Sequence, residues 1–107
     1  MKINNLEGAK MTLFVCLVHY TKPLEQVTER LQEHRDYLKK GYEKGILLAS
    51  GPRIPKDGGI IIGKFANKDE ALAFAANDPY VHYDLAKYEI LEFEPVLHAE
   101  ILKDFLK

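Results

Sequence analysis

The sequence predicts a single α+β domain built on one antiparallel sheet, and three observations lead to this prediction. At 107 residues, the chain is long enough for one modest core. Short runs of apolar, β-prone residues alternate with two amphipathic helical segments, in the order strand, helix, strand, strand, helix, strand. Turn-forming glycines, prolines and asparagines lie between these segments.

The first strand and the first helix have the clearest patterns. Leu13 to Tyr20 is a continuous apolar run that Pro23 soon follows, which indicates a strand covered on both faces. Leu24 to Gly45 is predicted to be one long helix, which Gly45 ends. Its apolar residues recur at spacings of three and four and form one stripe: Leu24, Val27, Leu31, Leu38 and Gly41–Tyr42. His34 lies within this stripe.

The remaining elements complete the pattern. Asn67 is the expected N-cap of the second helix, with Glu70 at its third position. The predicted elements are strands Ile46–Ser50, Ile60–Phe65 and Tyr88–Phe93, a helix Lys68–Ala76, a helical turn His82–Ala86 and a terminal helix Ala99–Lys107. This order is typical of the ferredoxin-like fold, with four antiparallel strands and both helices on one face of the sheet.

The second face of such a sheet needs a cover, because its strands are apolar on both sides. We expect a second copy of the chain to supply it, which gives a homodimer of the α+β barrel type. The alternative is a monomer whose terminal helix folds over the sheet. Residues 1–10 are expected to be a flexible leader without a function, and residues 11–107 a single domain.

Composition argues against several classes of protein. The formal net charge of −1 gives no reason to expect nucleic acid or an anionic membrane as a partner. No apolar run reaches the roughly 20 residues of a membrane span. The single cysteine, Cys16, excludes an internal disulfide and fits a reducing compartment, so we expect a cytoplasmic protein.

His34 and Asp78 are the candidate catalytic residues. A histidine titrates near neutral pH and suits general acid–base chemistry, but it needs a partner that fixes its tautomer. Asp78 follows the second helix, and antiparallel helices on one sheet face bring it toward the first helix. The alternatives are a buried structural histidine and a common Asp-Pro turn.

Ser50, Gly51 and Pro52 end the second strand and are candidate substrate-binding residues. Gly51 permits close approach of a ligand, and Ser50 offers a hydroxyl; a tight strand exit explains the same residues equally well. Tyr80 is a further candidate for shaping a pocket. The four histidines and one cysteine have no metal-ligand spacing, so neither a metal nor a cofactor is expected.

From about Met11 to Pro95 the chain resembles the YCII-related (YciI-like) proteins. The matching motifs are an apolar first strand, the histidine of Glu33–Leu38, the strand end Leu48–Pro52, Gly59, the turn Asn77–Tyr80, and Tyr88 in the closing strand. Many members carry Arg-Pro just before the histidine, where this chain has Leu31-Gln32-Glu33. A contact made by that arginine is therefore missing here or supplied by Arg30 or Arg35.

The resemblance implies a dimeric ferredoxin-like fold and a site centred on a histidine–aspartate pair, which maps onto His34 and Asp78. It does not fix one reaction. Activities proposed in the family are lyase-like, such as removal of a leaving group from a substituted aromatic ring, and related barrels bind small aromatic or lactone compounds.

The leading hypothesis is a small cofactor-free enzyme, either a lyase (dehydrohalogenase) or an isomerase, acting on a small organic substrate. Proton abstraction suits this equipment because it needs neither a nucleophile nor a metal. The alternatives are a small-ligand-binding or sensor dimer without catalysis, and a structural dimerisation domain.

Overall fold

The computed structural model describes residues 3–5 and 12–107, and it contains one four-stranded antiparallel sheet with helices. The strand order is β3-β4-β2-β5, and every neighbouring pair is antiparallel. The strands are β2 (Thr12–Tyr20), β3 (Leu47–Pro52), β4 (Gly58–Phe65) and β5 (Ala86–Phe93); the helices are α1 (Leu24–Thr28), α2 (Leu31–Glu43), α3 (Lys68–Ala76) and α4 (Pro79–His82). The predicted ferredoxin-like α+β fold is confirmed.

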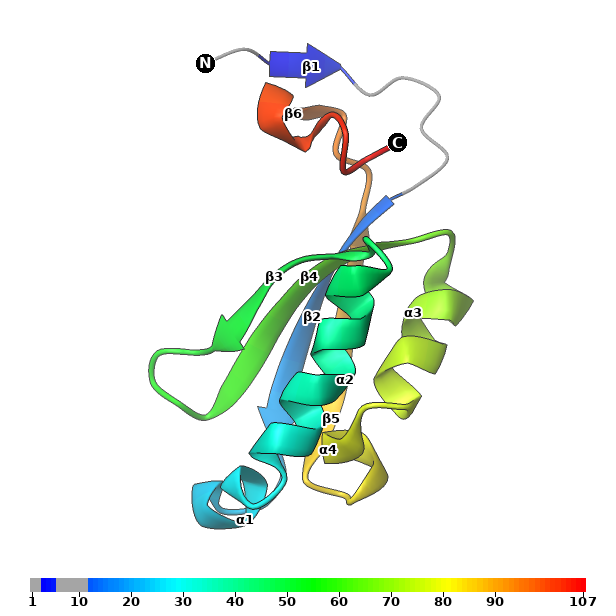
Figure 1. Cartoon of the computed structure of the whole chain (residues 1–107). Helices are drawn as coiled ribbons and strands as arrows, with labels where there is room; N and C mark the ends of the chain where they lie inside the picture. The colour runs from blue at the N-terminus through cyan, green and yellow to red at the C-terminus, as the bar shows by residue number, and fades with distance from the viewer. Residues whose placement is uncertain (1–2, 6–11) are drawn as a thin grey trace.

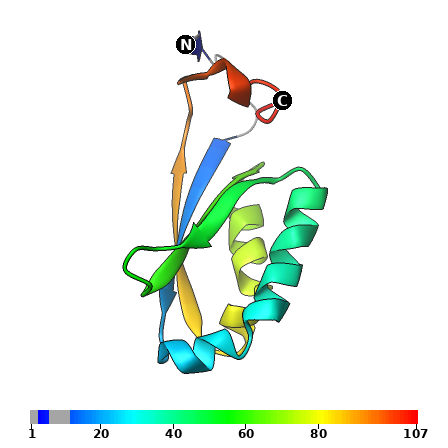
Figure 2. The ribbon, with the colours of Figure 1, turned by 60° about the vertical axis from the view of Figure 1, so that its left-hand side comes forward.

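The helices α2 and α3 cover the same face of the sheet (Figures 1 and 2). Alternate residues of β2, namely Phe14, Cys16 and Val18, belong to the core on this face and are almost completely buried. Val27 of α1 and Leu38 of α2 belong to the same core. Full burial of a side chain of this kind contributes about 1.5–3 kcal/mol.

The predicted long helix Leu24–Gly45 is wrong in one respect, because the chain forms two helices there. Between them, the amides of Glu29 and Arg30 donate to carbonyls only three residues back. Arg30 has φ −109° and ψ 12°, outside the α-helical region. The spacing of the apolar residues does not reveal this break, because the stripe continues through it.

The end of α2 agrees with the prediction. Gly45 adopts φ +75°, its amide donates to Tyr42, and the amide of Ile46 donates to Gly41. These two bonds define a Schellman motif, which requires a left-handed residue at the glycine position.

The second half of the chain follows the predicted pattern with one shift. The helix Lys68–Ala76 is confirmed, and the side chain of Asn67 accepts from the amide of Glu70 at 2.9 Å. The turn expected at His82–Ala86 instead lies at Pro79–His82. Asp78 caps this turn and a proline at the first helical position suits it, so the turn begins earlier.

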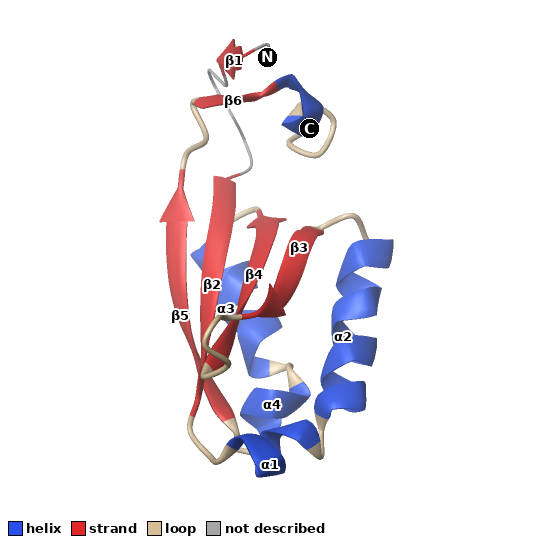
Figure 3. Cartoon of the chain, turned by 90° about the vertical axis from the view of Figure 1, so that its left-hand side faces the viewer, coloured by secondary structure: helices blue, strands red, loops and turns tan. Residues whose placement is uncertain are grey.

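The chain ends form a separate two-stranded sheet beyond one end of the main sheet (Figures 1 and 3). It pairs β1 (Ile3–Asn5) with β6 (Leu97–Ala99). A 3-10 turn, Glu100–Leu102, follows β6, so the predicted helix Ala99–Lys107 is wrong: the chain is extended up to Ala99 before it turns. Of the leader expected to be flexible, residues 1–2 and 6–10 lie outside the described part.

The face of the sheet opposite the helices carries apolar side chains. Strand register places Val15, Leu17, Ile60, Ile62, Leu91 and Phe93 on this face. Leu91 and Phe93 are 48% and 46% exposed. No helix covers this face within the described residues (Figure 3). In the same part of the chain, no helix is long and apolar enough to span a membrane.

Candidate active site

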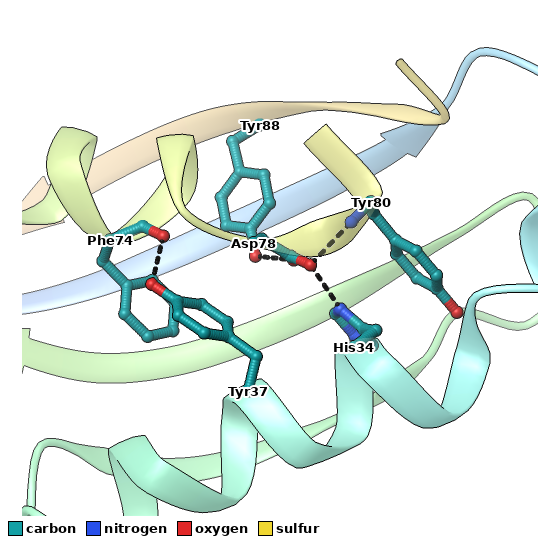
Figure 4. A network of polar contacts seen from close by, with 6 residues as sticks. All are labelled: His34, Tyr37, Phe74, Asp78, Tyr80 and Tyr88. Atoms are coloured by element: carbon teal, nitrogen blue, oxygen red, sulfur yellow. Dashed lines mark hydrogen bonds and ion pairs between the residues drawn. The ribbon is translucent and has the colours of Figure 1, made fainter. Parts of the chain in front are cut away.

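His34 lies in α2 and points toward α4, where its Nδ1 is 2.8 Å from Oδ1 of Asp78 (Figure 4). The two residues are 44 positions apart in the sequence. The His34 side chain is only 13% exposed and that of Asp78 is fully buried. The two predicted catalytic residues are thus in direct contact.

Asp78 is held by hydrogen bonds from three directions. Its Oδ1 accepts from the backbone amide of Tyr80 at 2.9 Å as well as from His34, and its Oδ2 accepts from the hydroxyl of Tyr88. A buried carboxylate is costly unless such donors surround it. Because an ionised carboxylate only accepts, His34 must donate from Nδ1.

The other ring nitrogen, Nε2, therefore has a free lone pair in the neutral imidazole. No group in residues 3–5 and 12–107 hydrogen-bonds to it. This is the tautomer that a general base needs, with one nitrogen anchored and the other available to a ligand.

Aromatic rings hold the imidazole and line the network. Tyr80 stacks on His34, with ring centroids 3.9 Å apart and planes 5° from parallel. Burial raises the pKa of Tyr80 to about 12, and burial also raises the pKa of Tyr37 to about 12. Burial, together with the negative charge of Asp78, raises the pKa of Tyr88 well above its usual range. These phenols are therefore neutral at physiological pH, and Tyr88 is a donor to Asp78.

A cavity of about 350 Å³ lies beside His34, a size suited to a small organic molecule. It is bordered by α1, α2, α4 and the β3–β4 hairpin. Its lining includes His34, Ser50, Gly51, Pro52 and Tyr80, together with apolar side chains such as Leu24, Val27 and Leu31. Five of the six predicted site residues thus line one cavity, and the sixth, Asp78, lies behind His34.

The strand-end motif, Ser50 to Pro52, forms the last part of β3. The hydroxyls of Ser50 and Tyr42 are 2.7 Å apart and share a hydrogen bond. A methyl group added at Gly51 would meet no atom within 4 Å, so this glycine borders open space. Strand register places Gly51 opposite Ile60, so this space lies on the face away from the helices, whereas Ser50, opposite Ile61, faces α2 and the cavity.

The other three histidines do not line the cavity, and neither does Arg53, which follows Pro52 in the sequence. His19 forms an ion pair with Glu89 at 3.0 Å, and Arg53 pairs with Asp57 at 3.7 Å. His82 is exposed, and His98 hydrogen-bonds the carbonyl of Ala99. In the described part of the chain, no group of three or more His, Cys, Asp or Glu residues is arranged to hold a metal ion.

Of the two arginines that the sequence analysis offered, Arg35 borders the cavity, whereas the guanidinium of Arg30 lies over the ring of Tyr83. Another residue of the cavity wall was not predicted. This residue is Lys56, in the β3–β4 loop, which no sequence pattern marked as a site residue. The role of Tyr88 was detectable, since the alternation in its strand places it on the helix-covered face with Ile90.

Together, the fold and the cavity define a ferredoxin-like α+β protein with a histidine–aspartate pair at a site of small-molecule size. The chain belongs to the YCII-related domain family, whose model matches residues 12–94.

Among solved structures, the chain is similar to the 5-chloro-2-hydroxyhydroquinone dehydrochlorinase TftG from Burkholderia phenoliruptrix AC1100, in complex with 2,5-dihydroxybenzoquinone. The TM-score is 0.67 at 20% identity, covering 77% of this chain and 93% of that one. At this identity the likeness shows the fold. A comparison with curated proteins gave no match.

Proposed function

We propose that the protein is a cofactor-free acid–base enzyme that eliminates a leaving group from, or isomerises, a small organic substrate. The observation that carries this proposal is the anchored imidazole beside the cavity. Asp78 holds Nδ1 of His34 at 2.8 Å, while Nε2 has no partner among the described residues. Most of the surrounding lining is apolar, which favours a substrate of one ring, aromatic or lactone.

In the proposed reaction, Nε2 of His34 removes a proton from a carbon of the substrate. In the elimination, the electron pair left behind expels a halide or similar group from a neighbouring carbon, so the net loss is one molecule of acid. In the isomerisation, His34 returns the proton to another atom. Asp78 stabilises the imidazolium formed in between, and Tyr80 keeps the ring in place by stacking.

Two findings support an elimination in particular. The chain belongs to the YCII-related family, and the structurally similar TftG is by its description a dehydrochlorinase with a dihydroxybenzoquinone bound. Proton transfer is also a task that the residues present can perform without further groups.

The proposal includes a homodimer in which two sheets pack against each other. The apolar open face supports this arrangement, since exposed apolar patches of this kind mark interfaces. A cytoplasmic location belongs to the same proposal, because a single buried thiol, Cys16, fits a reducing compartment.

The test is a screen of chlorinated hydroquinones, including 5-chloro-2-hydroxyhydroquinone, and of small lactones. Chloride release and ultraviolet spectra would be followed for the wild type, His34→Gln and His82→Gln. We expect His34→Gln to lower kcat by about 10²–10⁴-fold, the usual contribution of a general base. His82→Gln, at an exposed histidine, should keep full activity.

Full turnover by a folded His34→Gln variant would refute the enzyme proposal. The alternative, a ligand-binding or sensor dimer, is supported by the small, mostly apolar cavity, which by itself requires only binding. Ligands that bind with an affinity sensitive to His34→Gln, but are never converted, would establish that alternative.

A further inference from the structure

Two of the side chains that border the cavity are positively charged. Arg35 comes from α2, next to His34, and Lys56 comes from the loop between β3 and β4. None of the described residues that line the cavity is an aspartate or glutamate. The chain as a whole has a formal net charge of −1, so this distribution is specific to the cavity.

Neither cation is paired with a carboxylate in the described part of the chain. Two nearby arginines, by contrast, have carboxylate partners. Arg30 pairs with Glu33 at 2.8 Å, and Arg53 pairs with Asp57 at 3.7 Å. Within residues 3–5 and 12–107, Arg35 and Lys56 form no ion pair.

Asp78 is not among the residues that line the cavity. It is fully buried behind His34, and its oxygens accept hydrogen bonds from three donors. Burial, with smaller contributions from Tyr20 and Asp78, raises the pKa of Tyr80 to about 12, and the charge of Arg35 opposes this shift. The guanidinium therefore acts on the cavity wall itself, where Tyr80 stacks on His34.

From this arrangement we propose that the cavity takes a small organic anion, whose oxyanion is held by Arg35 and Lys56 while the rest of the molecule reaches His34. The inference deepens the proposed function and rests on it for the role of His34. A guanidinium and an ammonium are the groups that bind carboxylates and ionised hydroxyls, and a pair of them attracts anions to a cleft. Apolar residues such as Leu24 and Leu31 provide the surface for the carbon skeleton.

The experiment compares anions with neutral molecules of the same shape by isothermal titration calorimetry. The first pair is 2,5-dihydroxybenzoate and 2,5-dihydroxybenzamide, which tests a carboxylate. The second pair is 2,5-dihydroxybenzoquinone, an acidic compound, and its dimethoxy derivative, which tests ionised hydroxyls. The proteins are the wild type, Arg35→Gln, Lys56→Gln and, as a matched control on α2, Lys40→Gln, which is exposed and does not line the cavity.

The anion of at least one pair should bind more tightly than its neutral partner. Each of Arg35→Gln and Lys56→Gln should weaken that binding by about fivefold, as expected for an exposed ion pair. Lys40→Gln should not change it. The affinity should also fall between about 50 and 300 mM salt, because counterions screen exposed charges.

The inference is overturned if neutral partners bind as tightly as the anions, if the two cavity variants match Lys40→Gln, or if neither anion binds at about 10 mM. Its failure can be told from failure of the proposed function. Anion binding that persists in His34→Gln without turnover in the wild type rejects the enzyme and keeps the anion site. Turnover of a neutral substrate that is unaffected by Arg35→Gln and Lys56→Gln keeps the enzyme and rejects the anion site.

Discussion

At the scale of single residues, Asp78 links the fold to the chemistry. The same Oδ1 that contacts His34 also caps α4 by accepting from the amide of Tyr80. The turn that begins with Pro79 therefore fixes the position of the carboxylate. Placing a functional group on a capped turn gives it a definite orientation, as a positioned proton acceptor requires.

The buried phenols predict how stability depends on alkaline pH. Burial raises the pKa of both Tyr37 and Tyr80 from 10.0 to about 12. The folded state therefore binds these protons more tightly than the unfolded chain does, and the free energy of unfolding should fall as pH rises from 10 toward 12. Urea unfolding at a series of pH values measures this decrease.

Tyr37→Phe provides the test of this assignment. Without the Tyr37 phenol, stability should fall less steeply over the same pH range. The variant also loses the hydrogen bond from Tyr37 to the Phe74 carbonyl, so it should be about 1 kcal/mol less stable at neutral pH. An unchanged slope above pH 10 would show that Tyr37 does not titrate abnormally.

At the scale of elements, the break between α1 and α2 shapes the site. The short α1 contributes Leu24 and Val27 to the cavity, while α2 carries His34 and Arg35. Because the two helices are separate, residues from both border the same space. The β3–β4 hairpin then provides the facing wall with Ser50 and Lys56.

The C-terminal end of α2 depends on Gly45. We expect Gly45→Ala to lower the free energy of unfolding by about 1–2 kcal/mol, because its φ of +75° is strained for a residue with a Cβ. Gly51→Ala is the matched control, since its added methyl group would meet no atom within 4 Å. Chemical denaturation of both variants measures the difference; equal stabilities would contradict this account of the helix end.

The sequence allowed the sheet, the helix-covered face and the contact of His34 with Asp78 to be predicted, because they follow from periodicity, topology and a family motif. The break at Arg30 was not predictable, because one residue's backbone angles leave no mark on an apolar stripe. The start of α4, in contrast, could have been predicted, because Asp78 followed by Pro79 is typical of a helix N-terminus. The cationic residues of the cavity, such as Lys56, depend on tertiary contacts that spacing does not encode.

At the scale of the whole molecule, the open sheet face predicts the oligomeric state. Leu91→Lys places a charge in the proposed interface, so it should raise the dimer dissociation constant by roughly a hundredfold. Leu72→Lys is the control, because Leu72 is 49% exposed on α3, on the helix-covered side. Light scattering coupled to size-exclusion chromatography reports the mass of each. A monomeric wild type, or a Leu91→Lys variant as dimeric as the control, would refute the dimer.

The most direct test of the central claim is the tautomer of His34, measured by long-range ¹H–¹⁵N NMR. The account predicts that the neutral imidazole carries its proton on Nδ1, hydrogen-bonded to Asp78, and leaves Nε2 free as a base. Asp78→Ala should shift the proton to Nε2, because the anchor of Nδ1 is lost. A wild-type His34 protonated on Nε2, or a tautomer that is the same in Asp78→Ala, would contradict the account.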